Sequence, residues 1–146
     1  MLDNALRLAS AQAFSASGAT SQYLDQSQAK NLGDGEPLCM LFTVTAAGNY
    51  TANETYTFAI QAASTSAFSS PTTLESRTIA SAASNNPLAV GAQVALVLPP
   101  CVSDAEFLQG YLTLAGTTPT ISVDCDILPL SAVRKEAFYP AGFTVK

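Results

Sequence analysis

The chain has 146 residues and a net charge of −5, and only 12% of its residues are charged although 48% are apolar. This length fits one domain, which can bury enough surface to form a core without a metal or disulfide bonds. The six basic residues are scattered and form no stripe, which argues against partners such as nucleic acid or an anionic membrane surface.

The N-terminal stretch is rich in small residues and has two competing interpretations. Residues 5–15 (ALRLASAQAFS) fit an extended arm or a first strand, although Ala, Leu and Arg also favour a short helix. We therefore treat residues 1–20 as an N-terminal arm or first strand. Residues 21–28 (SQYLDQSQ) could add one more strand.

Three strands are expected in the next part of the chain. Residues 37–45 (PLCMLFTVT) are almost continuously apolar, which is typical of a central strand covered on both faces. Residues 55–61 (TYTFAIQ) alternate, with the aromatic and aliphatic side chains on one face. Residues 72–80 (TTLESRTIA) carry Glu75 and Arg77 on one face, which suits an edge strand protected by charge.

Three further strands follow towards the C-terminus, at residues 91–100, 106–114 and 118–128. Each places a row of apolar residues on one face, which predicts that this face turns towards a core, and residues 118–128 alternate most cleanly with polar residues. The inward residues are expected to be Val94, Leu96, Leu98, Leu108, Leu112, Leu114, Ile121, Val123, Cys125 and Ile127. The last strand places Asp124 and Asp126 on its other face.

Turn residues such as Gly, Pro, Asn and Ser separate these segments, and no alternation of strand and helix is present. The predicted class is therefore all-β, with two antiparallel sheets packed as a sandwich over residues 21–130. Eight strands would suggest a jelly roll, whereas seven would fit an immunoglobulin-like sandwich. Strand counting leaves this choice open.

Residues 131–146 (SAVRKEAFYPAGFTVK) differ in character from the sandwich. We expect an irregular, extended tail, because Pro140 and Gly142 interrupt regular structure. Three aromatic side chains, Phe138, Tyr139 and Phe143, indicate that the tail docks on the sandwich or on a neighbouring molecule.

Residue types that usually carry chemistry are scarce. The absence of His removes the commonest general base and metal ligand, so we expect no enzyme activity, metal or other cofactor. Asp124 and Asp126 could form a carboxylate pair, but a solvated outer face is the favoured interpretation. Three Cys with no metal-ligand spacing indicate free thiols in a reducing compartment. No apolar run reaches the ~18 residues that span a bilayer, and no signal peptide is expected.

The order of several segments resembles a known family. These are GEPLCMLFTVT, YTFAIQAASTSAFSSPTTLESRTI, VALVLPP and FLQGYLTLAGTTPTISVDCDI, and the hairpin at Phe58, Gln61 and Phe68–Leu74 is the most specific. Together they resemble the jelly-roll capsid cement (decoration) proteins of tailed bacteriophages, of the Bordetella podophage type. The resemblance extends from about Leu2 to Leu128.

This resemblance implies an all-β jelly roll with extended N- and C-terminal arms and a structural role in the virion. Such a protein is made in the bacterial cytoplasm, binds the outside of an icosahedral capsid and clamps neighbouring major capsid proteins. It also associates with itself, as a dimer by preference or otherwise a trimer. The alternative function is a ligand-binding sandwich, such as a carbohydrate-binding module or a phage fibre or adhesin domain, although the chain lacks Trp.

The candidate contact residues lie in both ends of the chain and in one loop. The loop from Ser64 to Pro71 offers a contact tip with Phe68 as its anchor. The candidates share apolar side chains and expected positions outside the core: Leu2, Leu6, Phe14, Phe68, Phe138, Tyr139 and Phe143.

Overall fold

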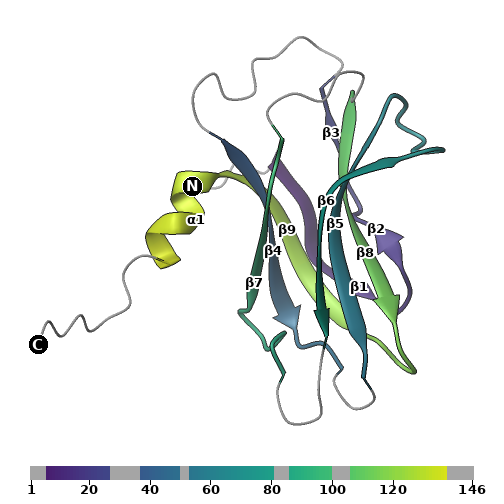
Figure 1. Ribbon diagram of the computed structural model, residues 1–146, viewed down its shortest axis with the longest axis vertical. Helices are drawn as coiled ribbons and strands as arrows, with labels where there is room; N and C mark the ends of the chain where they lie inside the picture. The colour runs from purple at the N-terminus through teal and green to yellow at the C-terminus, as the bar shows by residue number, and fades with distance from the viewer. Residues whose placement is uncertain (1–5, 27–36, 50–52, 81–85, 100–105, 138–146) are drawn as a thin grey trace, which may run out of the picture.

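Two antiparallel sheets face each other in the computed structural model (Figure 1). The structure describes residues 6–26, 37–49, 53–80, 86–99 and 106–137. The strands within these residues are β1 (Arg7–Phe14), β2 (Gly18–Ala19), β3 (Leu24–Asp25), β4 (Leu38–Ala46), β5 (Thr55–Ala63), β6 (Thr72–Ala80), β7 (Gln93–Val97), β8 (Phe107–Ala115) and β9 (Ile121–Pro129).

The strand pairing identifies the sandwich as a jelly roll. The first sheet has the order β1-β9-β4-β7, and the second has the order β2-β8-β5-β6, with β3 also paired to β8. The pairs are nested along the chain, since β5 pairs with β6, β4 with β7, β2 and β3 with β8, and β1 with β9. Because β2 and β3 share one position beside β8, the strands fill the eight positions of a jelly roll. The predicted all-β antiparallel sandwich is confirmed.

The core lies between the two sheets and consists of the side chains that the alternating patterns turn inward. Tyr56, Phe58 and Ile60 of β5 are fully buried, as predicted. Phe58 meets Phe42 of β4 across the sandwich, with ring centroids 5.2 Å apart. The predicted inward residues of β7, β8 and β9 also belong to this core or pack against it.

Strand β4 is buried on both faces, as its continuous apolar sequence predicts. Met40 and Phe42 belong to the central core, whereas Cys39 and Leu41 alternate onto the other face and are also buried. This arrangement follows from the position of β4 inside the first sheet, between β9 and β7.

Strand β6 ends the second sheet, which confirms the predicted edge strand. Arg77 is paired with Phe58 and Glu75 with Ile60 on β5. Directly paired residues point to the same side of a sheet, so both charged side chains lie on the side that faces the first sheet. Inward-pointing charge at an edge is one way in which proteins prevent nonspecific strand pairing.

The N-terminal stretch is a strand and not a helix or a free arm over its described part. Strand β1 pairs with β9, and its register shifts between Arg7 and Ala9 and again between Ala9 and Gln12. At the second shift Ala11 adopts a φ of 44°, which is strained for a residue with a side chain. The strand conformation is favoured because β1 buries Leu8 and Phe14 in the core.

The C-terminal segment begins differently from the expected irregular tail. Helix α1 (Leu130–Ala137) follows β9 directly and projects beside the first sheet, away from the second (Figure 1). The correction has a local cause, because Ala, Arg, Lys and Glu in this stretch have high helix propensity. The helix ends before Pro140, and residues 138–146 lie outside the described part of the chain.

Candidate functional site

Three aromatic side chains meet at one corner of the second sheet. Tyr23 lies between Phe68 and Phe107, with ring centroids 5.9 Å and 5.7 Å away and both rings in edge-on contact. Phe68 comes from the loop between β5 and β6, whereas Phe107 begins β8. We call these three residues the aromatic corner. Because Tyr23 remains 47% exposed, the aromatic corner presents aromatic surface on the outside of the protein.

The outer residues of β5 and β8 carry no charge and form a surface next to the aromatic corner, where the exposed Asp25 of β3, paired with Phe107, marks its border. We call this surface the uncharged face. Its residues alternate with the core residues of the same strands: Thr55, Thr57, Ala59, Gln61 and Ala63 from β5, and Phe107, Gln109, Tyr111, Thr113 and Ala115 from β8. None of these ten described residues is ionisable except Tyr111.

Side chains on the uncharged face bond with one another. The Gln109 side-chain amide donates to Gln61 Oε1 at 3.0 Å. The hydroxyl groups of Thr57 and Thr78, on neighbouring strands, lie 2.8 Å apart. These contacts satisfy polar groups within the sheet itself, so covering the face with another protein leaves few of them without a hydrogen bond.

Among the predicted contact residues within the described ranges, Phe68 and Leu6 are half-buried, and only Phe68 belongs to the aromatic corner. Phe68 adopts a φ of 47°, which turns the loop tip back onto Tyr23. Phe14 is only 5% exposed and belongs to the core, so its prediction as a contact residue is wrong. Leu6 is partly buried and packs against that core. The other candidates, Leu2, Phe138, Tyr139 and Phe143, lie outside the described residues.

Sequence reasoning missed Tyr23, Phe107 and Tyr111 as surface residues. A usable signal was present for two of them, because Phe107 and Tyr111 alternate with the inward Leu108 and Leu112 on the same strand. Tyr23 gave no such signal. Its position depends on the pairing of β3 with β8, which brings the segment next to Phe107.

The paired carboxylates of β9 do not form the solvated face that was favoured from the sequence. Arg7 Nε donates to Asp126 Oδ1 at 2.9 Å, and the Ala11 amide donates to Asp124 Oδ1 at 2.6 Å. Asp126 is only 5% exposed. The hydrogen bond to Asp126 raises the pKa of the Arg7 guanidinium above its ordinary value. Both carboxylates therefore hold β1 onto β9, and the Asp124 bond stabilises the strained Ala11.

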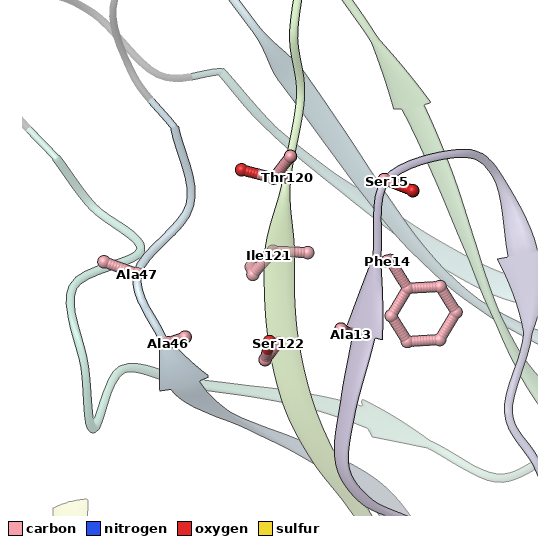
Figure 2. Close-up of a pocket in the computed structure, with 8 residues that line it drawn as sticks. All are labelled: Ala13, Phe14, Ser15, Ala46, Ala47, Thr120, Ile121 and Ser122. Atoms are coloured by element: carbon pink, nitrogen blue, oxygen red, sulfur yellow. The ribbon is translucent and has the colours of Figure 1, made fainter.

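A shallow hollow of about 180 Å³ opens on the other sheet, where β9 begins between the ends of β1 and β4 (Figure 2). It is lined by Ala13, Phe14, Ser15, Ala46, Ala47, Thr120, Ile121 and Ser122. None of these residues titrates near neutral pH, so the hollow offers no acid, base or metal ligand. Across the described ranges, no group of three or more His, Cys, Asp or Glu side chains could hold a metal ion.

Two of the three cysteines are described, and both are free, buried thiols. Burial raises the pKa of Cys39, and it raises that of Cys125 far above the ordinary range, where the nearby Asp126 adds to the effect. A thiol that resists ionisation is a poor nucleophile. Cys125 is therefore a packing residue, as its position on the inward face of β9 predicted.

These features define a jelly-roll β-sandwich protein with an uncharged outer face and an aromatic corner. No helix in the described part of the chain is long and apolar enough to cross a membrane. The Bbp16 family model matches residues 8–127, so the chain belongs to the Bbp16 family, a family of Bordetella phage proteins. The expected relationship to phage proteins is confirmed. No curated protein matches the chain by sequence.

Proposed function

We propose that this phage protein is a capsid cement (decoration) protein, which binds the outside of the icosahedral shell and clamps neighbouring major capsid proteins. It acts as a structural protein without enzymatic activity or a cofactor. It is made in the host cytoplasm and resides on the outer capsid surface of the virion.

The uncharged face is the single observation that best supports this proposal. Ten outward residues of β5 and β8 include no carboxylate or basic group, although the chain as a whole carries a net charge of −5. Desolvating an ion on binding costs several times more than desolvating a hydroxyl or an amide that keeps its hydrogen bond. A partner can therefore cover this face at low desolvation cost. The aromatic corner adds side chains of the kind that contribute most to binding energy.

The rigidity of the sandwich also fits a clamp. Strands β4 and β5 are buried inside their sheets, and their side chains meet in the shared core. A clamp must hold its contact surfaces at a fixed spacing while the shell is under pressure. Many copies on one lattice then act together, so each contact can be individually weak and still stabilise the particle.

Binding to capsids tests this proposal directly. Purified protein is mixed with expanded capsids that lack it, and sedimentation of the particles measures the bound fraction. We expect saturable, stoichiometric binding and a higher temperature of particle disruption. Unchanged particle stability after full binding would contradict the clamping role. Saturable glycan binding without capsid binding would instead support the ligand-binding module.

A charge placed on the uncharged face identifies the contact surface. Thr113 is exposed on β8, so Thr113→Glu should leave folding unchanged and weaken capsid binding at least tenfold, because the new carboxylate must be desolvated. The matched control is Gln93→Glu, an exposed residue on the outer side of the other sheet. Equal binding by both variants would exclude the uncharged face as the contact.

A further inference from the structure

Strand β6 is the longest open edge in the described part of the sandwich. It has nine residues, whereas the edge strand β7 has five, and β2 and β3 have two each. The remaining edge, β1, is interrupted by two register shifts, whereas β6 has one, at Leu74, and pairs continuously with β5 from Glu75 to Ala80. The Gln22 amide and the Ser21 hydroxyl also donate to its Leu8 carbonyl, at 2.9 Å and 3.3 Å. An open strand edge carries unpaired backbone groups that can bind another strand.

The charges of β6 restrict which strand can pair with it. Glu75 and Arg77 are two residues apart and point to the same side of the sheet. If an ordinary apolar strand paired with β6, the Glu75 and Arg77 side chains would each lose hydration without gaining a partner of opposite charge. These two residues therefore oppose most pairings, and they favour a strand that offers a basic and an acidic side chain at matching positions.

The strand itself has this pattern when it is read in the opposite direction. If two copies of β6 run antiparallel with Ser76 opposite Ser76, Glu75 of each copy lies opposite Arg77 of the other. Shifting the register so that either Glu75 or Arg77 lies opposite its own equivalent creates a pair of like charges, which is destabilising. A single-residue shift leaves all four charges without an opposite partner. Only the register centred on Ser76 joins both pairs of opposite charge.

We propose that β6 is a self-pairing edge, through which two copies of this chain join their second sheets about a two-fold axis at Ser76. The axis is perpendicular to the sheet, so the inner and outer sides of the two sandwiches continue into each other. The uncharged faces of both copies then form one surface on the same side. This inference does not depend on capsid binding, because the contact forms between copies of the purified chain.

Exchanging the two charges tests the proposal on the intact protein. A sedimentation dilution series should give a dimer for the natural chain. Glu75→Arg and Arg77→Glu each convert both opposite pairs into like-charge pairs, so either change should weaken the dimer about tenfold or more. The double variant E75R/R77E restores both pairs and should return to within about threefold of the natural value.

Three results would overturn the proposal: a monomer throughout the natural dilution series, single variants that dimerise normally, or a double variant no better than the singles. Circular dichroism and thermal melting check that all variants fold. Since neither residue belongs to the core, folding should be retained.

A cysteine pair tests the register itself. Residues opposite each other in antiparallel strands have Cα atoms about 4.5–5.5 Å apart, which is within the range of a disulfide. Cys101, the third cysteine of the chain, is first replaced by Ser so that it cannot cross-link, and Ser76→Cys in this background should then form an intermolecular disulfide under mild oxidation. Thr78→Cys is the matched control, because it is exposed on the same side of β6 but lies roughly 13 Å from its equivalent across the axis. Equal cross-linking of both variants would refute the register.

Discussion

Gly110 lies at a close contact between β8 and the interior, and it provides a sharp test of the packing. A Cβ atom added there would meet Thr20 Cγ2 at 2.8 Å and Phe42 Cζ at 3.0 Å. Thr20 cannot move freely, because its hydroxyl accepts from the Gly110 amide at 3.1 Å and donates to the Gln22 carbonyl at 2.8 Å. We therefore expect Gly110→Ala to lower the free energy of unfolding.

The size of this effect follows from three contributions. Overpacking of a core costs about 1–3 kcal/mol, and weakening the buried hydrogen bonds of Thr20 costs about 1 kcal/mol. Replacing Gly by Ala restricts the unfolded chain, which offsets roughly 0.4–1 kcal/mol. The net loss is about 2 kcal/mol. For a chain of this size, that lowers the melting temperature by about 6 °C.

Urea unfolding followed by circular dichroism measures the change, and calorimetry measures the melting temperature. Gly18→Ala is the matched control, because the nearest atom to its new Cβ would be Phe14 Cε1 at 3.8 Å, an ordinary contact. Adding Thr20→Ser to Gly110→Ala removes the clashing methyl group and should recover part of the loss. If Gly110→Ala proved as stable as Gly18→Ala, the described packing of β8 against Thr20 and Phe42 would be refuted.

Three further predictions concern the buried polar groups. Arg7→Ala should lower the free energy of unfolding in urea by about 2 kcal/mol, because it leaves the buried Asp126 carboxylate without its ion pair. The control Arg77→Ala changes an exposed residue and should have little effect. Equal losses in the two variants would contradict the prediction. Burial raises the pKa of Tyr56 above its ordinary value of 10.0, so its contribution to stability is complete below that pH and is lost as the pH rises above it. Near pH 8, Tyr56→Phe should lower the free energy of unfolding by about 1 kcal/mol, because the hydrogen bond to the Asn49 carbonyl is lost. Above pH 10, the free energy of unfolding in urea should fall less steeply with pH for this variant than for the natural chain. Parallel declines would refute the reasoning. Iodoacetamide at pH 8, read by mass spectrometry, should leave Cys39 and Cys125 unmodified until urea unfolds the chain, and rapid native labelling of either thiol would contradict their burial.

The alternating sequences were sufficient to predict most of the sandwich. Tyr56, Phe58 and Ile60 share one face because side chains alternate along a strand, and burying that face removes the largest apolar area from water. The position of β6 at an edge was also predictable, since Glu75 and Arg77 could not be buried at low cost inside a sheet. These features depend on residues close together in the chain.

The candidate contact surface was less predictable because its residues come from distant segments. The aromatic corner joins Tyr23, Phe68 and Phe107, and no local pattern specifies that these three rings meet. Helix α1 was missed for another reason, since Pro140 and Gly142 beyond it suggested an irregular tail although the preceding residues favour a helix.

The sequence by itself determined the strands, their inward faces and the low charge of the surface, because these depend on the period of the backbone and on residue type. The tertiary structure decided which strands became neighbours, and thus that Arg7 meets Asp126 and that Phe14 is buried. The physical reason is that pairing between distant strands depends on how the whole sandwich closes around one shared core, and no short stretch of the chain contains that information.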